Sequence, residues 1–401
     1  MIALTCLLGL ALAPVSVSSD VRVVGEALDG SVREFTLGSL SLTDPRDLGL
    51  VLLRFEGLEP WRGQRIEDEI LSLELANGDR LQGRVVGGQG EVLSLELIGG
   101  VVLPIDISSF RSLVFPARLP SGFATTIGPA PQGDRVYRLT SSSVDVDDGT
   151  VLRFSDSGIG FESESIGKRV FGWGEVAALF VEVLEETPSA AETEGVAVVL
   201  DLVDASRVRG RMRSLNASGL TLLLADTEVL LPLETIAEIA VDDGSIAFLS
   251  DMPVVSEEGL GAPFDDGDDG PAIGMVWPHR VDRASTGARL TAGGRVWTRG
   301  IGAHAPSRLT WQLDGSWSEL RGRVAIDDST KKVQAEGSVV FRIHVDDELA
   351  WESGVIRGGD PPVPFPPIAL RGKRKLVLEA DMATRSFQGD RADWLRLVLV
   401  R

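Results

Sequence analysis

Cysteine and histidine are scarce in this chain. Its 401 residues include one cysteine and three histidines. The cysteine, Cys6, lies in an apolar segment at the start of the chain, so we expect neither disulfides nor thiol catalysis. The histidines, His279, His304 and His344, all lie in the last third of the sequence, and we expect no metal centre built from histidines.

Catalytic sequence signatures are also missing. The sequence contains no Gly-x-Ser-x-Gly elbow, no His-Glu-x-x-His pair and no phosphate-binding loop. A glycosidase needs two carboxylates at a defined separation, normally on a large catalytic fold, and no such fold is indicated. We therefore expect a protein that is not an enzyme. The remaining alternative is an unrecognised activity in the N-terminal region.

Basic residues are outnumbered by acidic ones, and the two kinds are unevenly distributed along the chain. The formal net charge is -20, from 59 acidic and 39 basic residues. Residues 272–401 hold 20 basic and 15 acidic residues, so the excess of acid lies entirely before them. Because a strongly acidic surface repels phosphate, we expect no nucleic acid as a partner.

Long apolar runs are absent apart from one at the N-terminus. Residues 2–12 are apolar and are followed by small residues, the layout of a secretory signal peptide over residues 1–19. Cleavage after Ala13 and cleavage near Ser18 or Ser19 are both compatible with the pattern, and a retained N-terminal anchor is the alternative. A membrane span needs about 20 apolar residues. We therefore expect an extracytoplasmic protein, periplasmic, cell-surface or secreted, with no span in the mature chain.

The remaining sequence is dominated by short runs in which apolar and polar residues alternate. Residues 71–75 and 339–343 are examples, and Gly, Asp and Asn separate such runs. This alternation is typical of half-buried strands joined by turns, and long helical periodicity is scarce. The fold is therefore predicted to be mostly β.

Residues 20–241 contain internal similarity within this β-rich pattern. Residues 73–84 parallel residues 200–211, and the clearest copies span 71–115 and 198–241. Weaker copies are suggested at 25–42 and 144–183. Each copy is typical of a small β-meander or barrel-like unit that must pack on a neighbour to cover its apolar face. The region is a candidate surface for a protein partner.

The last third carries the most specific motifs. Residues 242–271 form an acidic connecting segment rich in Gly and Pro, which overlaps the start of a module at 246–401. The motifs of that module occupy residues 277–280, 293–307, 324–328, 337–343 and 390–394. In this order they resemble the NPCBM family, the novel putative carbohydrate-binding modules, with Gly-Ile-Gly-x-His-x-x-Ser at 300–307 as the most diagnostic. The resemblance implies a C-terminal galactose-binding-like jelly-roll β-sandwich that binds carbohydrate or polysaccharide.

The candidate ligand residues follow from this resemblance and from the chemistry of sugars. Indole rings stack on sugar C–H faces, while histidine and charged side chains bind hydroxyl groups. His304 has an alternative role, in which its ring bonds buried backbone. The proline-rich loop at 357–367 is either the wall of a groove or a rigid connector. The candidates are His304, Ser307, Trp297, Arg357, Asp360 and Trp394.

Calcium is the one cofactor that the sequence of the module suggests. Sandwiches of this type often carry a structural calcium, and Asp327 and Asp328 form an acidic pair at the end of a predicted strand. Such pairs are more often turns, so we expect no cofactor and keep these two residues as calcium candidates.

The sequence as a whole predicts a non-catalytic exported protein that binds a glycan through its C-terminal module. Two rival roles remain open at this stage. One is an extracytoplasmic structural or adhesion protein whose sandwich mediates protein contacts, and the other is an accessory subunit of a separate glycoside hydrolase.

Overall fold

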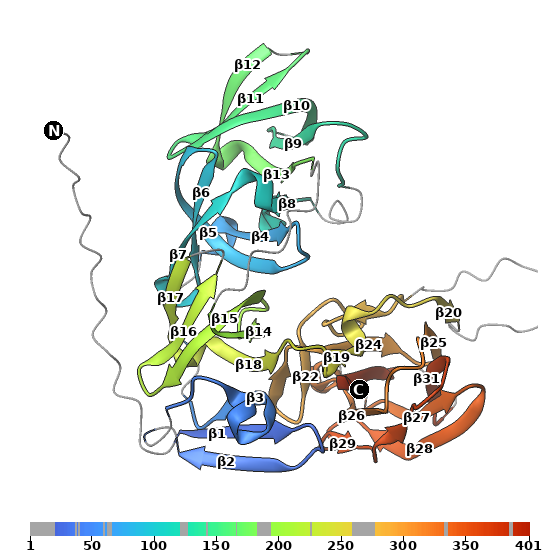
Figure 1. The fold of residues 1–401 in the computed structure, drawn as a ribbon. Helices are drawn as coiled ribbons and strands as arrows, with labels where there is room; N and C mark the ends of the chain where they lie inside the picture. The colour runs from blue at the N-terminus through green and yellow to red at the C-terminus, as the bar shows by residue number, and fades with distance from the viewer. Residues whose placement is uncertain are drawn as a thin grey trace, which may run out of the picture. The chain divides into compact units, whose positions relative to one another are not determined.

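A computed structural model describes the fold in two compact units, residues 1–241 and residues 242–401 (Figure 1). The described residues are 21–36, 38, 41–58, 61, 66–120, 127–141, 143–165, 167–182, 194–224, 227–258, 277–332, 336–384 and 388–401. The predicted signal peptide and the acidic run at 265–271 lie outside them. Within these ranges, no helix has the length and apolar composition needed to cross a membrane.

The first unit consists of antiparallel strands joined by short turns. Over its described residues, one order of elements occurs three times: four strands, a short 3-10 helix, and a fifth strand that pairs with the first. The first run comprises β4 (Ile70–Leu75), β5 (Arg80–Gly90), β6 (Val92–Leu97), β7 (Val102–Asp106), η5 (Ile107–Ser109) and β8 (Phe110–Val114), with an additional η4 (Ile98–Gly100) after β6. The second comprises β9 (Asp134–Leu139), β10 (Val144–Ser155), β11 (Gly158–Ser163), β12 (Gly167–Gly172), η8 (Trp173–Glu175) and β13 (Val176–Phe180). The third comprises β14 (Val196–Leu202), β15 (Arg207–Asn216), β16 (Gly219–Leu224), β17 (Thr227–Leu231), η9 (Leu233–Thr235) and β18 (Ile236–Val241).

A shorter group precedes these runs. It contains β1 (Arg22–Ala27), β2 (Val32–Thr36), η2 (Pro45–Leu48), β3 (Leu50–Glu56) and η3 (Glu67–Glu69). Strand β1 pairs with both β2 and β3, and β3 pairs with β18 of the third run. The first two runs are joined in the same way, through their fifth strands β8 and β13.

The long second strand gives each run its curvature. β5, β10 and β15 each shift register against the next strand, which is the signature of a β-bulge. A bulge bends a strand and increases its twist. Each second strand can therefore pair with the first strand along one part and with the third along another.

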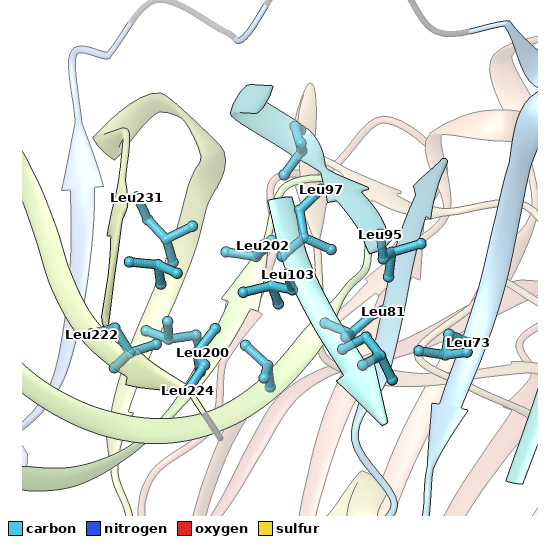
Figure 2. Close-up of a cluster of buried hydrophobic side chains, with 14 of the residues drawn as sticks. Leu73, Leu81, Leu95, Leu97, Leu103, Leu200, Leu202, Leu222, Leu224 and Leu231 are labelled. Carbon is cyan, nitrogen blue, oxygen red and sulfur yellow. The ribbon is translucent and has the colours of Figure 1, made fainter. Parts of the chain in front are cut away.

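Leucines at matching positions of two runs fill the core of the first unit. Figure 2 shows them packed in one cluster. Leu73, Leu95 and Leu97 come from the first run, while Leu200, Leu222 and Leu224 occupy the corresponding strands of the third. All six are almost fully buried, as the alternating sequence pattern predicts.

The second unit is a sandwich of two antiparallel sheets (Figure 1). The first sheet contains β19 (Ile246–Phe248), β21 (Arg280–Val281), β24 (Gly300–His304), β26 (Glu319–Ile326), β29 (Val363–Pro364), β30 (Ile368–Ala369) and β32 (Arg391–Val400). The second contains β20 (Ser256–Glu258), β25 (Ser307–Gln312), β27 (Ser338–Val345), β28 (Glu348–Arg357) and β31 (Lys375–Met382). The hairpin β22 (Leu290–Ala292) and β23 (Arg295–Trp297) and the short helices η10 (Leu249–Asp251) and η11 (Asp328–Lys332) complete the unit.

Trp311, Phe341 and Trp394 lie in the core between the two sheets and have no exposed surface. The prediction of a mostly β chain with a C-terminal sandwich is confirmed.

Candidate functional site

One end of the sandwich brings together chain segments that are far apart in the sequence. β24 ends there at His304, β26 at Ile326 and β28 at Arg357. Their partners β27 and β32 begin at the same end, because neighbouring strands in both sheets are antiparallel. Strand β25 also begins there, because it follows β24 after two residues. Most of the sequence-predicted ligand residues lie on or beside the described parts of these loops.

His304 is buried at the end of β24, and its ring is locked in one tautomer. Nδ1 lies 2.8 Å from the backbone oxygen of Ala305. A carbonyl oxygen only accepts hydrogen bonds, so Nδ1 carries the proton and Nε2 is left as an acceptor. Burial lowers the pKa of His304 below its ordinary value, and nearby Arg391 lowers it further, although the Ala305 carbonyl acts in the opposite direction. The ring is therefore neutral at pH 7.

Trp277 stacks on the His304 ring. The ring centroids are 4.2 Å apart and the planes meet at 17°. Trp277 itself is only partly buried. Arg391 is directly opposite His304 in the β24–β32 register, and its Nη1 donates to Ser329 Oγ at 2.8 Å. An indole ring, an imidazole acceptor and a guanidinium thus converge at this end.

Asp390 precedes Arg391 at this end of the module, and only one of its two carboxylate oxygens is hydrogen-bonded in the described structure. Its backbone oxygen accepts from Ala305 N at 2.9 Å, and its Oδ1 accepts from Ser338 N at 2.6 Å. Oδ2 is buried and has no hydrogen-bond partner among the described residues. Burial raises the pKa of Asp390 to about 6, even though the Ser338 N–H favours the ionised form.

Two glycines allow the surrounding loops to pack backbone against backbone. Gly337 has a φ of 60°, and a Cβ there would lie 2.0 Å from the oxygen of Gly389. A Cβ on Gly358 would lie 1.9 Å from the oxygen of Glu336. No side chain fits in such gaps, so both positions require glycine.

Arg357 and Asp360, both ligand candidates from the sequence, lie at this end of the module and have different roles. Asp360 Oδ2 accepts the backbone N–H of Arg357 at 2.8 Å, and Asp360 N–H donates to the oxygen of Arg357 at 3.1 Å. Asp360 therefore closes a turn. The Arg357 residue is exposed, and its guanidinium is accessible to a ligand.

Ser307 and Trp297 are less suited to direct contact. Ser307 Oγ is buried and has no hydrogen-bond partner in the described structure. Trp297 lies on the β22–β23 hairpin, where its Nε1 donates to Ala292 O at 3.3 Å. The Arg295 guanidinium lies 4.7 Å from the centroid of that ring. The Trp297 ring is thus already engaged within its own hairpin.

Trp394 requires a correction. Its residue is 0% exposed, and its ring meets that of Phe341 edge-on at 5.0 Å and 89°. Because the ring lies in the core, it presents no surface to a ligand. Sequence analysis missed Trp277, Asp390 and Arg391, although all three belong to motifs that carry the family resemblance.

The two calcium candidates lie beside this end and have partners of their own. Asp327 is fully buried. Its Oδ1 accepts from Ser329 N and its Oδ2 from Thr291 N, both at 2.9 Å. Asp328 Oδ2 accepts from Gly294 N at 2.7 Å. In the described ranges, His, Cys, Asp and Glu side chains form no group of three or more suited to a metal ion.

Comparisons with known proteins identify the module. Residues 249–400 match the family model described as the NPCBM/NEW2 domain. A stretch of 121 residues is 37% identical to alpha-1,3-galactosidase B of Akkermansia muciniphila, covering 29% of this chain and 15% of that protein. The chain therefore matches only a small part of this curated relative.

Solved structures of carbohydrate-binding modules also align with the chain. CBM51 from Clostridium perfringens GH95, in complex with methyl-galactose, is 20% identical with a TM-score of 0.32, and the match covers 39% of this chain and 99% of that one. The CBM51-2 and INT domains of Clostridium perfringens ZmpB, in complex with GlcNAc, are 18% identical with a TM-score of 0.33. That match covers 61% of this chain and 43% of the other.

Proposed function

Since residues 249–400 form an NPCBM/NEW2 domain, we propose that this protein binds glycans at the end of the module that carries Trp277, His304 and Arg391. The observation that carries the proposal is the stacked Trp277–His304 pair, in which the tautomer leaves Nε2 as an acceptor.

The chemistry of the three side chains suits a sugar. Hydroxyl groups both donate and accept, so Nε2 of His304 accepts from one and the Arg391 guanidinium donates to another. The partly exposed Trp277 ring offers an apolar surface to sugar C–H groups. Half of an aromatic side chain's buried area contributes about 2–3 kcal/mol. A Kd of 1 mM already needs about 4.1 kcal/mol, so the polar partners must supply the remainder.

We propose galactose-containing glycans as the first ligands to test. The relative that shares 37% identity over 121 residues is an alpha-1,3-galactosidase. A module attached to such an enzyme serves it best by binding the glycan on which the enzyme acts. The same binding chemistry on the present chain would direct it to similar glycans.

The protein's role is binding without turnover, outside the cytoplasm. Glycoside hydrolysis needs two carboxylates facing the scissile bond. At this end of the module, Asp390 is buried and Asp360 is bonded to a backbone N–H, which suits neither the acid nor the base. The signal-like segment at 1–19 supports export. The first unit then displays the module or links it to a protein partner.

Glycan-array screening of the full chain, followed by calorimetry with the best ligand, tests this proposal. His304→Ala should reduce affinity at least tenfold while the far-UV circular dichroism stays unchanged. His344→Ala is the matched control, because His344 lies on β27 beside Glu379, 3.2 Å away, and outside the site. A folded wild-type protein that binds no glycan would favour the protein-contact role. A glycoside hydrolase that co-purifies with the chain would favour the accessory-subunit role.

A further inference from the structure

Two runs of the first unit are joined through the starting edges of their long second strands. Arg80 and Arg207, the first residues of β5 and β15, are antiparallel register partners. Ser206, directly before β15, accepts the backbone N–H of Gln82 at 2.8 Å. The reciprocal bond runs from β15 to the residue directly before β5, also at 2.8 Å. This β5–β15 joint therefore uses the same positions of both strands.

Strand β10 is the second strand of the remaining run and has the same edge. Its hairpin closes with a hydrogen bond from Thr140 N to Ser143 O at 2.9 Å, and the β9–β10 register continues from there without a shift. Bonded and non-bonded pairs alternate along an antiparallel ladder. The backbone N–H and C=O groups of Val144 and Val146 therefore point away from β9.

Among the described residues, no strand pairs with this edge of β10. Strand β9 lies on the other side of residues 144–149, and β11 joins β10 only at Thr150, its seventh residue. The third strands join β5 and β15 earlier, at Gly83 and Arg211, the fourth and fifth residues. The open edge is thus longest on β10. An unpaired edge of this kind is a template for another strand.

The side chains on the β10 edge suit pairing with an identical edge. The first and third residues of β10 are Val144 and Val146, where β5 has an arginine and a glutamine and β15 has two arginines. Val146 is 45% exposed in spite of its apolar side chain. The residue directly before β10 is Ser143, the counterpart of the Ser206 acceptor in the β5–β15 joint, and it is exposed.

We propose that β10 pairs with β10 of a second copy of this chain, in the register of the β5–β15 joint. Val144 then lies opposite Val144 of the second copy, as Arg80 lies opposite Arg207. Ser143 Oγ accepts the backbone N–H of Val146 in the second copy, and the reverse bond forms by symmetry. Such an interface uses the same patch twice, so it closes at two chains.

The acidic residues of β10 do not oppose this pairing. Asp145 and Asp147 both lie beside Arg138 of β9, at 3.8 Å and 2.6 Å. In the proposed register they are opposite Ser143 and Ser141 of the second copy. Like charges destabilise a strand pair when they are directly opposite, and here no two carboxylates are.

The other open second-strand edge belongs to β2, which pairs only with β1 among the described strands. Its first and third residues are Val32 and Glu34, and Glu34 pairs with Arg22 at 2.8 Å. Pairing β10 with β2 of another copy would remove an ionised side chain from water, which is costly. It would also join unlike patches head to tail. The valines of β10 therefore favour its pairing with itself.

Light scattering after size-exclusion chromatography measures the assembly of the full chain. We expect twice the mass of one chain for the wild-type protein. Val146→Asp should reduce it to the mass of one chain, because it places like charges on both sides of the two-fold axis. Val170→Asp is the matched control, since Val170 lies on β12 of the same run and is 47% exposed. Its mass should stay that of two chains.

An engineered disulfide tests the register. Cys6 is the single cysteine of the sequence, so in a Cys6→Ser background Val144→Cys supplies the one thiol. Residues directly opposite in a bonded antiparallel pair have Cα atoms about 5.5 Å apart, within the range of a disulfide. Oxidation should therefore link two chains on a non-reducing gel. Val170→Cys in the same background should stay unlinked.

The proposal is overturned if the wild-type chain has the mass of one chain and Val144→Cys forms no cross-link. An assembly larger than two chains that Val32→Asp dissociates would assign the β10 edge to β2 instead. The wild-type mass decides the matter even if a variant fails to fold. No measurement uses sugar, so this result and the glycan-array result can fail independently. If the module binds glycans as proposed, a pair of chains carries two modules and gains avidity for a polysaccharide.

Discussion

Asp79 accepts two hydrogen bonds from Arg209 across the first unit, from the backbone N–H at 2.8 Å and from Nη1 at 2.6 Å. The reverse contact also exists, since Ser206 Oγ accepts the backbone N–H of Gln82 at 2.8 Å. Asp79 and Ser206 each precede the second strand of a run, and Gln82 and Arg209 are the third residues of those strands. The two hairpins therefore contact each other reciprocally, as the halves of a two-fold interface do.

Asp79→Ala should destabilise the first unit by about 1–3 kcal/mol, because it removes the buried acceptor of the Arg209 backbone N–H. Asp79 is 1% exposed, so water cannot replace the carboxylate. Urea unfolding of the full chain measures the change. Asp145→Ala is the control, since its side chain is 53% exposed and lies 3.8 Å from Arg138. An equal effect of both substitutions would contradict a specific role for the hairpin contact.

Leu222→Ala should cost the first unit about 2–5 kcal/mol, the range for truncating a buried leucine. Leu222 is fully buried among the leucines of Figure 2. Leu230→Ala is the control on the neighbouring strand β17, where the side chain is 52% exposed. Calorimetric melting distinguishes the two, and similar midpoints for both variants would contradict the buried core described for this unit.

Two tryptophan substitutions separate the binding end of the module from its core. Trp394→Ala should destabilise the second unit by about 3–5 kcal/mol. Trp277→Ala should leave the fold intact but lower glycan affinity at least tenfold, because the ring is partly exposed and contacts His304. Thermal melting and calorimetry on the same samples measure both effects. Unchanged glycan affinity in a folded Trp277→Ala variant would remove Trp277 from the site.

Asp390 makes the stability of the second unit depend on pH. Its pKa of about 6 in the folded state exceeds the ordinary aspartate value of about 3.9. The folded state then retains a proton that the unfolded state releases, so stability falls as pH rises from about 4 to about 6 and levels off above. The raised pKa of Asp393 acts in the same direction.

Asp390→Asn should reduce the loss of stability between pH 4 and pH 6, because the amide does not titrate and its oxygen can still accept the backbone N–H of Ser338. Melting temperatures measured between pH 4 and pH 7 test this expectation. Asp314→Asn is the control, since hydrogen bonds from Ser316 lower rather than raise the pKa of Asp314. The assignment is wrong if Asp390→Asn keeps the whole wild-type slope.

Much of the fold could be predicted from local sequence. Alternating runs such as residues 71–75 and 339–343 form β4 and β27, because a strand with one buried face needs that alternation. The similar segments 73–84 and 200–211 fall on β4–β5 and β14–β15, which have the same pairing. Motif order located the module, and the match at 249–400 confirms it.

The candidate site was only partly predictable. His304, Arg357 and Asp360 lie at the same end of the module, whereas Trp394 lies in the core. A motif identifies Trp277 and Trp394 equally well, but it does not show which ring faces solvent. That depends on the register of β32 against β24 and on the packing of the second sheet.

The amino-acid sequence by itself determined the β class, the acidic first part and the location of the module, because alternation, charge and motif spacing are local properties of the chain. Only the tertiary structure decided that Trp277 stacks on His304, that Arg391 faces it, and that Asp393 is buried beside Asp327 without a donor. These relationships arise from strand pairing between distant segments, and register alone sets which side chains share a face.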